Sequence, residues 1–266
     1  MVCLYFITRK DDIFVYVYKN PLYYEIAFSF VNAKKQIDLF ETFVKKFSII
    51  QVKTFLDIGC GPSLQLREIA KRGYSAVGLD TSSRMLQYLK QKAKEERIAI
   101  TTVRGDMHNF KLTKKADCAF ILMGTVSYMK SNSNFLSHLD VVANALNKGG
   151  LYIIENLRLD WTSRHLFKKQ EWIMKRGDTQ IKTTYMIRQK DVLKQMLEET
   201  MVLNVNDNGK RKTLKEKVDT KIIFPQEFVE LVKMNGKFEF LGWFERNTIK
   251  PLKKASMNNI TLLRRK

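Results

Sequence analysis

The chain has 266 residues, of which 45% are hydrophobic and 28% charged, with 12 Gly and 4 Pro. This composition excludes a disordered or collagen-like chain and predicts one large core with room for an insertion. The formal net charge of +20 is spread along the chain. A lysine-rich solvated surface explains it best, and nucleic acid stays open as a partner.

The first 20 residues (1–20) are predicted to form a β-hairpin extension, because the β-rich runs 2–8 and 13–18 flank a charged Arg-Lys-Asp-Asp turn. From 21 to 48 the apolar residues follow helical spacing and form one broad face. Apolar strands then alternate with helices. This alternation is typical of a mostly parallel sheet covered on both faces, so we assign 21–162 to an α/β core.

The alternation ends after this core. Four segments with alternating, polar-faced patterns occupy 163–224, and Asn206-Asp207-Asn208-Gly209 provides a turn between two of them. We therefore expect an antiparallel β insertion there, acting as a cap. Pro225 then begins a helix, and two last strands follow. We expect 225–266 to complete the core sheet.

Three cysteines, Cys3, Cys60 and Cys118, show neither disulfide nor metal-ligand spacing. No apolar run approaches the roughly 18 residues of a membrane-spanning helix, and the apolar start at 2–7 is too short for the core of a signal peptide. These observations predict a cytoplasmic protein with no bound metal and no membrane partner.

The most informative segment is a buried-type strand that enters a glycine turn and then a helix, Phe55-Leu56-Asp57-Ile58-Gly59-Cys60-Gly61-Pro62-Ser63. Gly59 and Gly61 allow a ligand to approach the backbone, and the first amides of the helix point at that ligand. A tight turn without a ligand and a dinucleotide site are the alternatives. The dinucleotide pattern needs a third glycine where this chain has Leu64, so a nucleoside without a pyrophosphate fits better.

Two further strands lead to carboxylates. Asp80 ends the strand 76–80, where a carboxylate is placed to accept both hydroxyls of a ribose. Helix capping is the alternative role, although Thr81 or Ser82 could serve equally well. After the third strand comes Arg104-Gly105-Asp106-Met107, where a carboxylate can accept the exocyclic amine of adenine and a methionine can lie against its ring.

With these three strand-end carboxylates the chain resembles the class I S-adenosylmethionine (SAM)-dependent methyltransferases. It is most similar to the small stand-alone group with a Tyr-Tyr-acid segment in the N-terminal helix, here Leu22-Tyr23-Tyr24-Glu25. The motifs cover roughly 20–160, with Pro62-Ser63 at a place where the family often has glycine. The resemblance implies a Rossmann-like, seven-stranded sheet with an antiparallel last strand, and SAM as the cofactor.

The resemblance also implies the cofactor contacts. The glycine turn and its aspartate would surround the methionine moiety, the second acid would hold the ribose, and the third acid with its methionine would frame the adenine. A methionine past the fourth strand would border the sulfonium, and a tyrosine of the N-terminal helix would close over the cofactor. The full set is Tyr24, Asp57, Gly59, Gly61, Asp80, Thr81, Met85, Asp106, Met107 and Met123.

Methyl transfer from a sulfonium is an in-line displacement, which needs an aligned nucleophile roughly 3 Å from the methyl carbon and little acid–base machinery. Tyr128 and Asn156 lie where the fourth and fifth strands should end, and we take them as catalytic candidates, with ordinary loop residues as an equal alternative. The leading hypothesis is a methyltransferase acting on a small molecule, chosen by the cap. An RNA or protein methyltransferase and a SAM-binding, non-catalytic regulator are the alternatives.

Overall fold

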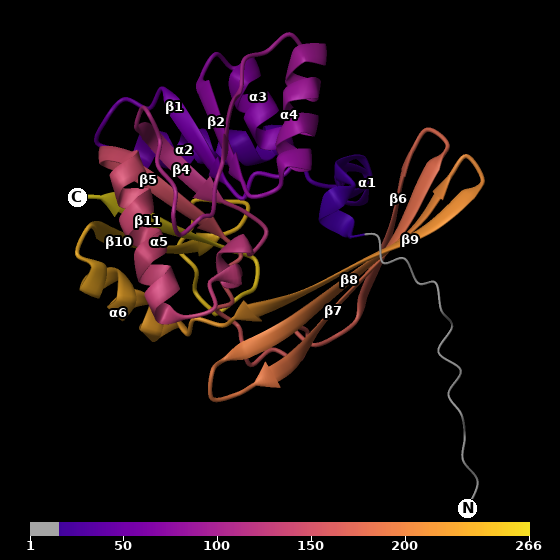
Figure 1. Cartoon of the computed structure of the whole chain (residues 1–266). Coiled ribbons are helices and arrows are strands. Elements are labelled where there is room, and N and C mark those ends of the chain that lie inside the picture. The colour runs from indigo at the N-terminus through magenta and orange to yellow at the C-terminus, as the bar shows by residue number, and fades with distance from the viewer. Residues whose placement is uncertain (1–15) are drawn as a thin grey trace, which may run out of the picture.

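The computed structural model describes residues 16–266 (Figure 1). Most of the hairpin predicted for 1–20 lies outside the described residues. Within them, the 3-10 helix η1 (Val17–Lys19) stands where the second hairpin strand was expected to end, so the strand does not reach Tyr18. Two residues turn the chain here. The Asn20 side chain donates to the Tyr16 carbonyl at 3.0 Å, and Pro21 takes the first position of the next helix.

Seven strands form the core sheet in the order β10-β11-β5-β4-β1-β2-β3. The pairs among β1 to β5 are parallel, and β11 runs antiparallel to both of its neighbours. This arrangement confirms the predicted mostly parallel, Rossmann-like sheet with an antiparallel last strand. The strands are β1 (Thr54–Ile58), β2 (Ser75–Asp80), β3 (Thr101–Arg104), β4 (Ala116–Ile121), β5 (Leu146–Glu155), β10 (Phe238–Glu245) and β11 (Asn259–Arg265).

Helices cover both faces of this sheet because its strands are apolar on both sides. In β1, Phe55 packs on one face and its neighbour Leu56 on the other, and both are fully buried. Burying each such side chain stabilises the fold by roughly 1.5–3 kcal/mol. The Phe55 face is covered by α2 (Ala33–Phe47), α3 (Leu64–Lys71) and α4 (Ser83–Glu95), and the Leu56 face by α5 (Asn132–Ala145) and α6 (Pro225–Asn235).

The helical region predicted for 21–48 consists of two helices, α1 (Pro21–Ala27) and α2. The chain leaves the helix after Ala27, and the Asn32 side chain starts the second helix by accepting a hydrogen bond from the Lys35 amide at 3.0 Å. The first helix does not join the core layers. Its buried face, with Ile26 and Phe28, packs against the inserted sheet instead.

The insertion is a four-stranded antiparallel sheet whose strands pair in chain order. Asn208 and Gly209 both have positive φ, at 50° and 79°, which is the geometry of a tight two-residue hairpin turn. Figure 1 shows this sheet reaching from the core past α1. The strands are β6 (Gln170–Arg176), β7 (Thr179–Asp191), β8 (Met196–Asp207) and β9 (Lys210–Lys221).

One short element completes the fold, the 3-10 helix η2 (Thr125–Tyr128), which follows β4 and contacts β9. The inserted sheet therefore touches the core at the edge where the parallel strands end. Within 16–266 no helix is both long enough and apolar enough to span a membrane.

Candidate functional site

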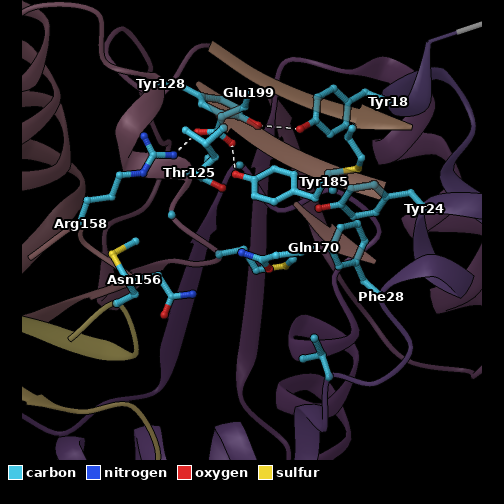
Figure 2. A pocket seen from close by; sticks show the side chains of 18 of the residues that line it. Tyr18, Tyr24, Phe28, Thr125, Tyr128, Asn156, Arg158, Gln170, Tyr185 and Glu199 are labelled. Carbon is cyan, nitrogen blue, oxygen red and sulfur yellow. Dashed lines mark hydrogen bonds and ion pairs between the residues drawn. The ribbon is translucent and has the colours of Figure 1, made fainter. Parts of the chain in front are cut away.

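A cavity of about 840 Å³ lies between the carboxyl ends of the core strands and the inserted sheet (Figure 2). Cavities that bind small ligands have volumes of roughly 300–1,000 Å³, so this one can hold a nucleoside cofactor together with a small acceptor. The wall includes eight of the predicted cofactor residues and both catalytic candidates, namely Tyr24, Gly59, Gly61, Asp80, Thr81, Met85, Met107, Met123, Tyr128 and Asn156.

The glycine turn after β1 adopts a backbone that favours glycine. Gly59 and Gly61 have φ of +70° and +53°. The amides of Gly59 and Cys60 donate to the Leu79 carbonyl at 2.8 and 2.9 Å, which fastens the turn to β2. A Cβ on Gly59 would lie 2.8 Å from Cγ2 of Thr125. The turn is therefore held open toward the cavity by the absence of side chains.

Asp57 lies beneath this turn and is buried. Ser63 caps α3 by accepting a hydrogen bond from the Leu66 amide at 3.0 Å, and its hydroxyl donates to Asp57 at 2.6 Å. Burial, together with the nearby charges of Asp80 and Glu155, raises the pKa of Asp57 to about 7, against the lowering effect of the Ser63 hydrogen bond. Asp57 is thus poised to change protonation near neutral pH.

Asp57 faces a side pocket of about 80 Å³ rather than the main cavity. The side pocket shares Tyr24, Gly59 and Met123 with the main cavity, so it extends that cavity between α1 and the start of α3. Buried Glu25 also lines it. Arg67 and Arg176 pair with Glu25 at 2.8 and 2.6 Å, so Asp57 is the carboxyl group of this pocket that suits a small polar group such as an ammonium.

Asp80 contributes a carboxylate to the cavity wall at the end of β2. Its Oδ2 accepts a hydrogen bond from the Gly61 amide at 2.8 Å, and its Oδ1 accepts one from the Ser82 amide at 2.7 Å. Burial raises the pKa of Asp80, and these amide hydrogen bonds oppose the rise. Ser82 is the N-cap of α4, so Asp80 is not needed as a cap. The Thr81 amide is a third backbone donor to this carboxylate, which leaves an acceptor position for a ligand hydroxyl.

Asp106 departs from the prediction, because it does not line the cavity. Its carboxylate pairs with Nδ1 of His108 at 2.5 Å and accepts the His108 amide at 3.2 Å. These contacts belong to a tight turn in which the Asn109 amide donates to the Asp106 carbonyl at 3.0 Å. The neighbours Gly105 and Met107 do reach the cavity. After β3, Gly105 and Met107 therefore line the cavity, and the Asp106 carboxylate does not.

The ends of β4 and β5 carry two non-glycine residues in the left-handed region, Met123 at φ 55° and Asn156 at φ 59°. This backbone conformation costs a non-glycine residue on the order of 1–3 kcal/mol, and it persists where contacts with neighbouring residues fix it. Glu155 supplies that hold, since its buried carboxylate accepts the Met123 amide at 2.9 Å and pairs with Arg246 at 2.8 Å. The Asn156 amide donates to the Asn259 carbonyl at 2.9 Å.

Aromatic residues cover the side of the cavity formed by α1. The rings of Tyr24 and Phe28 lie 4.7 Å apart, and Trp172 of β6 packs beside Phe28 at 5.7 Å. The Trp172 indole donates to the Ala27 carbonyl at 2.7 Å, which joins the inserted sheet to α1. Tyr24 thus lies in the cavity wall, and its closing over a ligand stays a prediction.

Several cavity residues were not predicted from the sequence, and some of them lie on the insertion. Tyr185 and Glu199 project from β7 and β8 into the cavity, and Arg158 reaches them from the segment after β5 (Figure 2). Alternation along these strands identifies a shared face, but it does not show that the face meets a cavity. The other missed lining residues include Tyr18, Phe28, Thr125 and Gln170.

Residues 55–150 match the family model described as a methyltransferase domain. A protein of Geobacillus sp. (strain WCH70) that carries a methyltransferase name is 24% identical over 148 residues, which are 54% of this chain and 59% of the relative. The dTDP-3-amino-3,4,6-trideoxy-alpha-D-glucopyranose N,N-dimethyltransferase of Streptomyces venezuelae is 25% identical over 105 residues, 40% of this chain and 43% of the relative. The chain thus matches about half the length of these curated relatives.

Solved structures extend the similarity of fold over nearly the whole chain. A SAM-dependent methyltransferase from Clostridium acetobutylicum ATCC 824 superposes with a TM-score of 0.76 at 16% identity, covering 91% of this chain and 96% of that one. SAM-bound CalS10, an amino pentose methyltransferase from Micromonospora echinaspora, gives 0.71 at 13% identity, covering 97% and 100%. Residues 55–150 thus match a methyltransferase domain, and nearly the whole chain shares the fold of solved SAM-dependent methyltransferases.

Proposed function

We propose that this protein transfers a methyl group from SAM to a small molecule held between the core strand ends and the inserted sheet. The observation that carries the proposal is the cavity itself. At its core end Asp80 presents a carboxylate to a ligand hydroxyl, and the other end is walled by Tyr185 and Glu199 of the insertion. One cavity thus offers room for two ligands side by side.

The residues of the core end fit SAM. The absence of a side chain on Gly59 leaves the turn accessible to a ligand, and Asp80 suits a ribose diol. Met85 and Met107 offer soft apolar surface for the adenine ring. The side pocket beside Asp57 suits the ammonium of the methionine moiety.

SAM supplies an activated methyl carbon, and the protein's work is to align a nucleophile with it and exclude water. Tyr24, Phe28 and Trp172 provide the apolar cover on one side. We propose that Met123 borders the reacting centre, because it stands in a strained backbone at the end of β4 and lines both pockets. Tyr128 and Asn156 then flank the acceptor.

For the acceptor we propose an amino-bearing small molecule of the sugar type. Two similar proteins, the Streptomyces venezuelae dimethyltransferase and the Micromonospora echinaspora enzyme, are named for amino sugars. The inserted sheet also supports a small acceptor, since it walls the cavity at the end opposite the cofactor residues. The +20 charge is the one feature that favours RNA.

The test is incubation with methyl-labelled SAM and four acceptors: a dTDP-linked amino sugar, and the small-molecule, RNA and protein fractions of a cell extract. We expect label in the amino sugar or the small-molecule fraction, and its loss in an Asp80→Ala variant. Label confined to RNA or protein would replace the proposal with the corresponding macromolecular methyltransferase. Cofactor binding without transfer to any fraction would indicate a regulator.

A further inference from the structure

Two strands of the inserted sheet contact Arg158 of the core segment directly, and a third strand reaches it through Glu199. The Arg158 guanidinium donates to Thr220 of β9 at 2.9 Å and to Oε1 of Glu199 on β8. The hydroxyl of Tyr185 on β7 donates to the other oxygen, Oε2, of Glu199 (Figure 2). The side chains of Arg158 and Glu199 are only 6% and 10% exposed. Charges removed from water to this extent are stable only as a pair, so Glu199 is ionised.

The ionised carboxylate determines what Tyr185 can do in the cavity. A carboxylate only accepts hydrogen bonds, so the Tyr185 hydroxyl donates its one hydrogen to Glu199. Burial first, and then the charge of Glu199, raise the pKa of Tyr185, which keeps that hydrogen in place. Tyr185 also lines the cavity. Toward a ligand it therefore offers lone pairs and no proton.

Two further tyrosines, Tyr18 and Tyr128, line the same cavity. The hydroxyls of Tyr18 and Tyr128 lie 2.6 Å apart, so one of their two hydrogens is used between them and one remains to donate. Arg158 offers a ligand little net charge, because Glu199 neutralises it. The wall thus combines donors, namely one tyrosine hydrogen and the remaining N–H groups of Arg158, with several acceptors. Its complement is a hydroxyl or amino group, which both donates and accepts.

We propose that this wall is the acceptor subsite and that Tyr185 receives a hydrogen bond from an N–H or O–H group of the acceptor. The inference rests on the proposed methyltransferase function and specifies its acceptor class as an amine or a hydroxylated compound. An amine that donates its hydrogen to Tyr185 keeps its lone pair free to attack the methyl carbon. Glu199 and Arg158 act through Tyr185 as positioning residues.

The experiment compares two substitutions that each delete one phenol oxygen. Tyr185→Phe removes the proposed contact. Tyr23→Phe is the matched control, because the Tyr23 hydroxyl also donates to a carboxylate of the inserted sheet, Asp207 at 2.9 Å, but does not line the cavity. Calorimetry measures the binding of S-adenosylhomocysteine, and labelled SAM measures methyl transfer to the dTDP-linked amino sugar and to the small-molecule fraction.

We expect both variants to bind S-adenosylhomocysteine within twofold of the unsubstituted protein. Methyl transfer, measured as kcat/KM, should fall roughly tenfold in Tyr185→Phe and stay unchanged in Tyr23→Phe. Equal transfer by the two variants would overturn the role of Tyr185 and leave the methyltransferase proposal standing. A product methylated on sulfur, carbon or a carboxylate would overturn the acceptor class. Absence of transfer by the unsubstituted protein would remove the proposed function and this inference with it.

Discussion

Replacing Asp80 with alanine should remove the principal polar contact with the cofactor ribose. In the structure the two carboxylate oxygens already accept the Gly61 and Ser82 amides at 2.8 and 2.7 Å. The substitution therefore deletes these internal hydrogen bonds, together with one from the Thr81 backbone, as well as the contact proposed for the ligand. A variant of this kind has to be tested for stability as well as for binding.

The expected loss of affinity follows from the number of hydrogen bonds. A hydrogen bond to a charged group contributes roughly 1.5–3 kcal/mol. Losing one of them at the lower limit already costs about a tenfold rise in Kd, since 1.4 kcal/mol corresponds to a factor of ten. We expect at least that rise for S-adenosylhomocysteine, and a larger one if both ribose hydroxyls lose their partner.

Titration calorimetry with S-adenosylhomocysteine measures this effect, with circular dichroism to establish that the variant is folded. The matched control is Asp140→Ala on α5, which removes a carboxylate held by Asn235 and Lys237, both at 2.8 Å, outside the cavity. The control should bind as the unsubstituted protein does. A folded Asp80→Ala variant whose Kd stays within twofold of the control would refute the ribose assignment.

Three other predictions concern the same region. Because burial raises the pKa of Asp57 to about 7, the folded protein holds a proton between about pH 4 and 7 that the unfolded chain releases. The free energy of unfolding, measured by denaturant titration, should therefore fall as pH rises through this window, by up to about 1.4 kcal/mol per pH unit. The Asp57→Asn variant should lack this contribution. The same dependence of the unfolding free energy on pH in both proteins would contradict the reasoning. Gly59→Ala should lower the free energy of unfolding by more than Gly177→Ala. Both glycines have positive φ, but only at Gly59 would the new Cβ meet another atom, Cγ2 of Thr125 at 2.8 Å. Equal losses of stability in thermal unfolding of the two variants would show that Thr125 moves aside. Hydrogen exchange should show increased protection in α1 and in part of the inserted sheet when S-adenosylhomocysteine binds; protection confined to the core strand ends would mean that the cap does not close with the cofactor.

The cofactor end of the cavity was largely predictable because its chemistry is local. A buried strand followed by two glycines and a helix start, over 55–71, specifies its own turn, and parallel strands place their end residues at one edge. Asp80 therefore reached the cavity as expected. Asp106 did not, because the imidazole of His108, two residues further on, offers its carboxylate a nearer partner. Strand-end position alone does not determine the direction of a side chain.

The acceptor end could not be predicted because it depends on contacts between distant segments. Tyr185 and Glu199 share a face only in the register that pairs Ile187 with Glu199 and Tyr185 with Met201. Arg158 is 41 positions from Glu199 in the chain, and no local pattern links the two. Tyr18 was assigned to a strand, although Pro21 and Asn20 turn the chain into helices beside it. In each case tertiary packing decides the outcome.

The position of β11 in the sheet has a consequence for how the chain folds. This strand, 259–265, separates β5 from β10, so the core sheet stays divided until almost the last described residues are available. The inserted sheet consists of sequential hairpins and needs only local contacts. During synthesis the cap can therefore form first, while β5 presents an unpaired edge that is open to pairing with another chain. A product that ends before 259 would keep that edge and should aggregate.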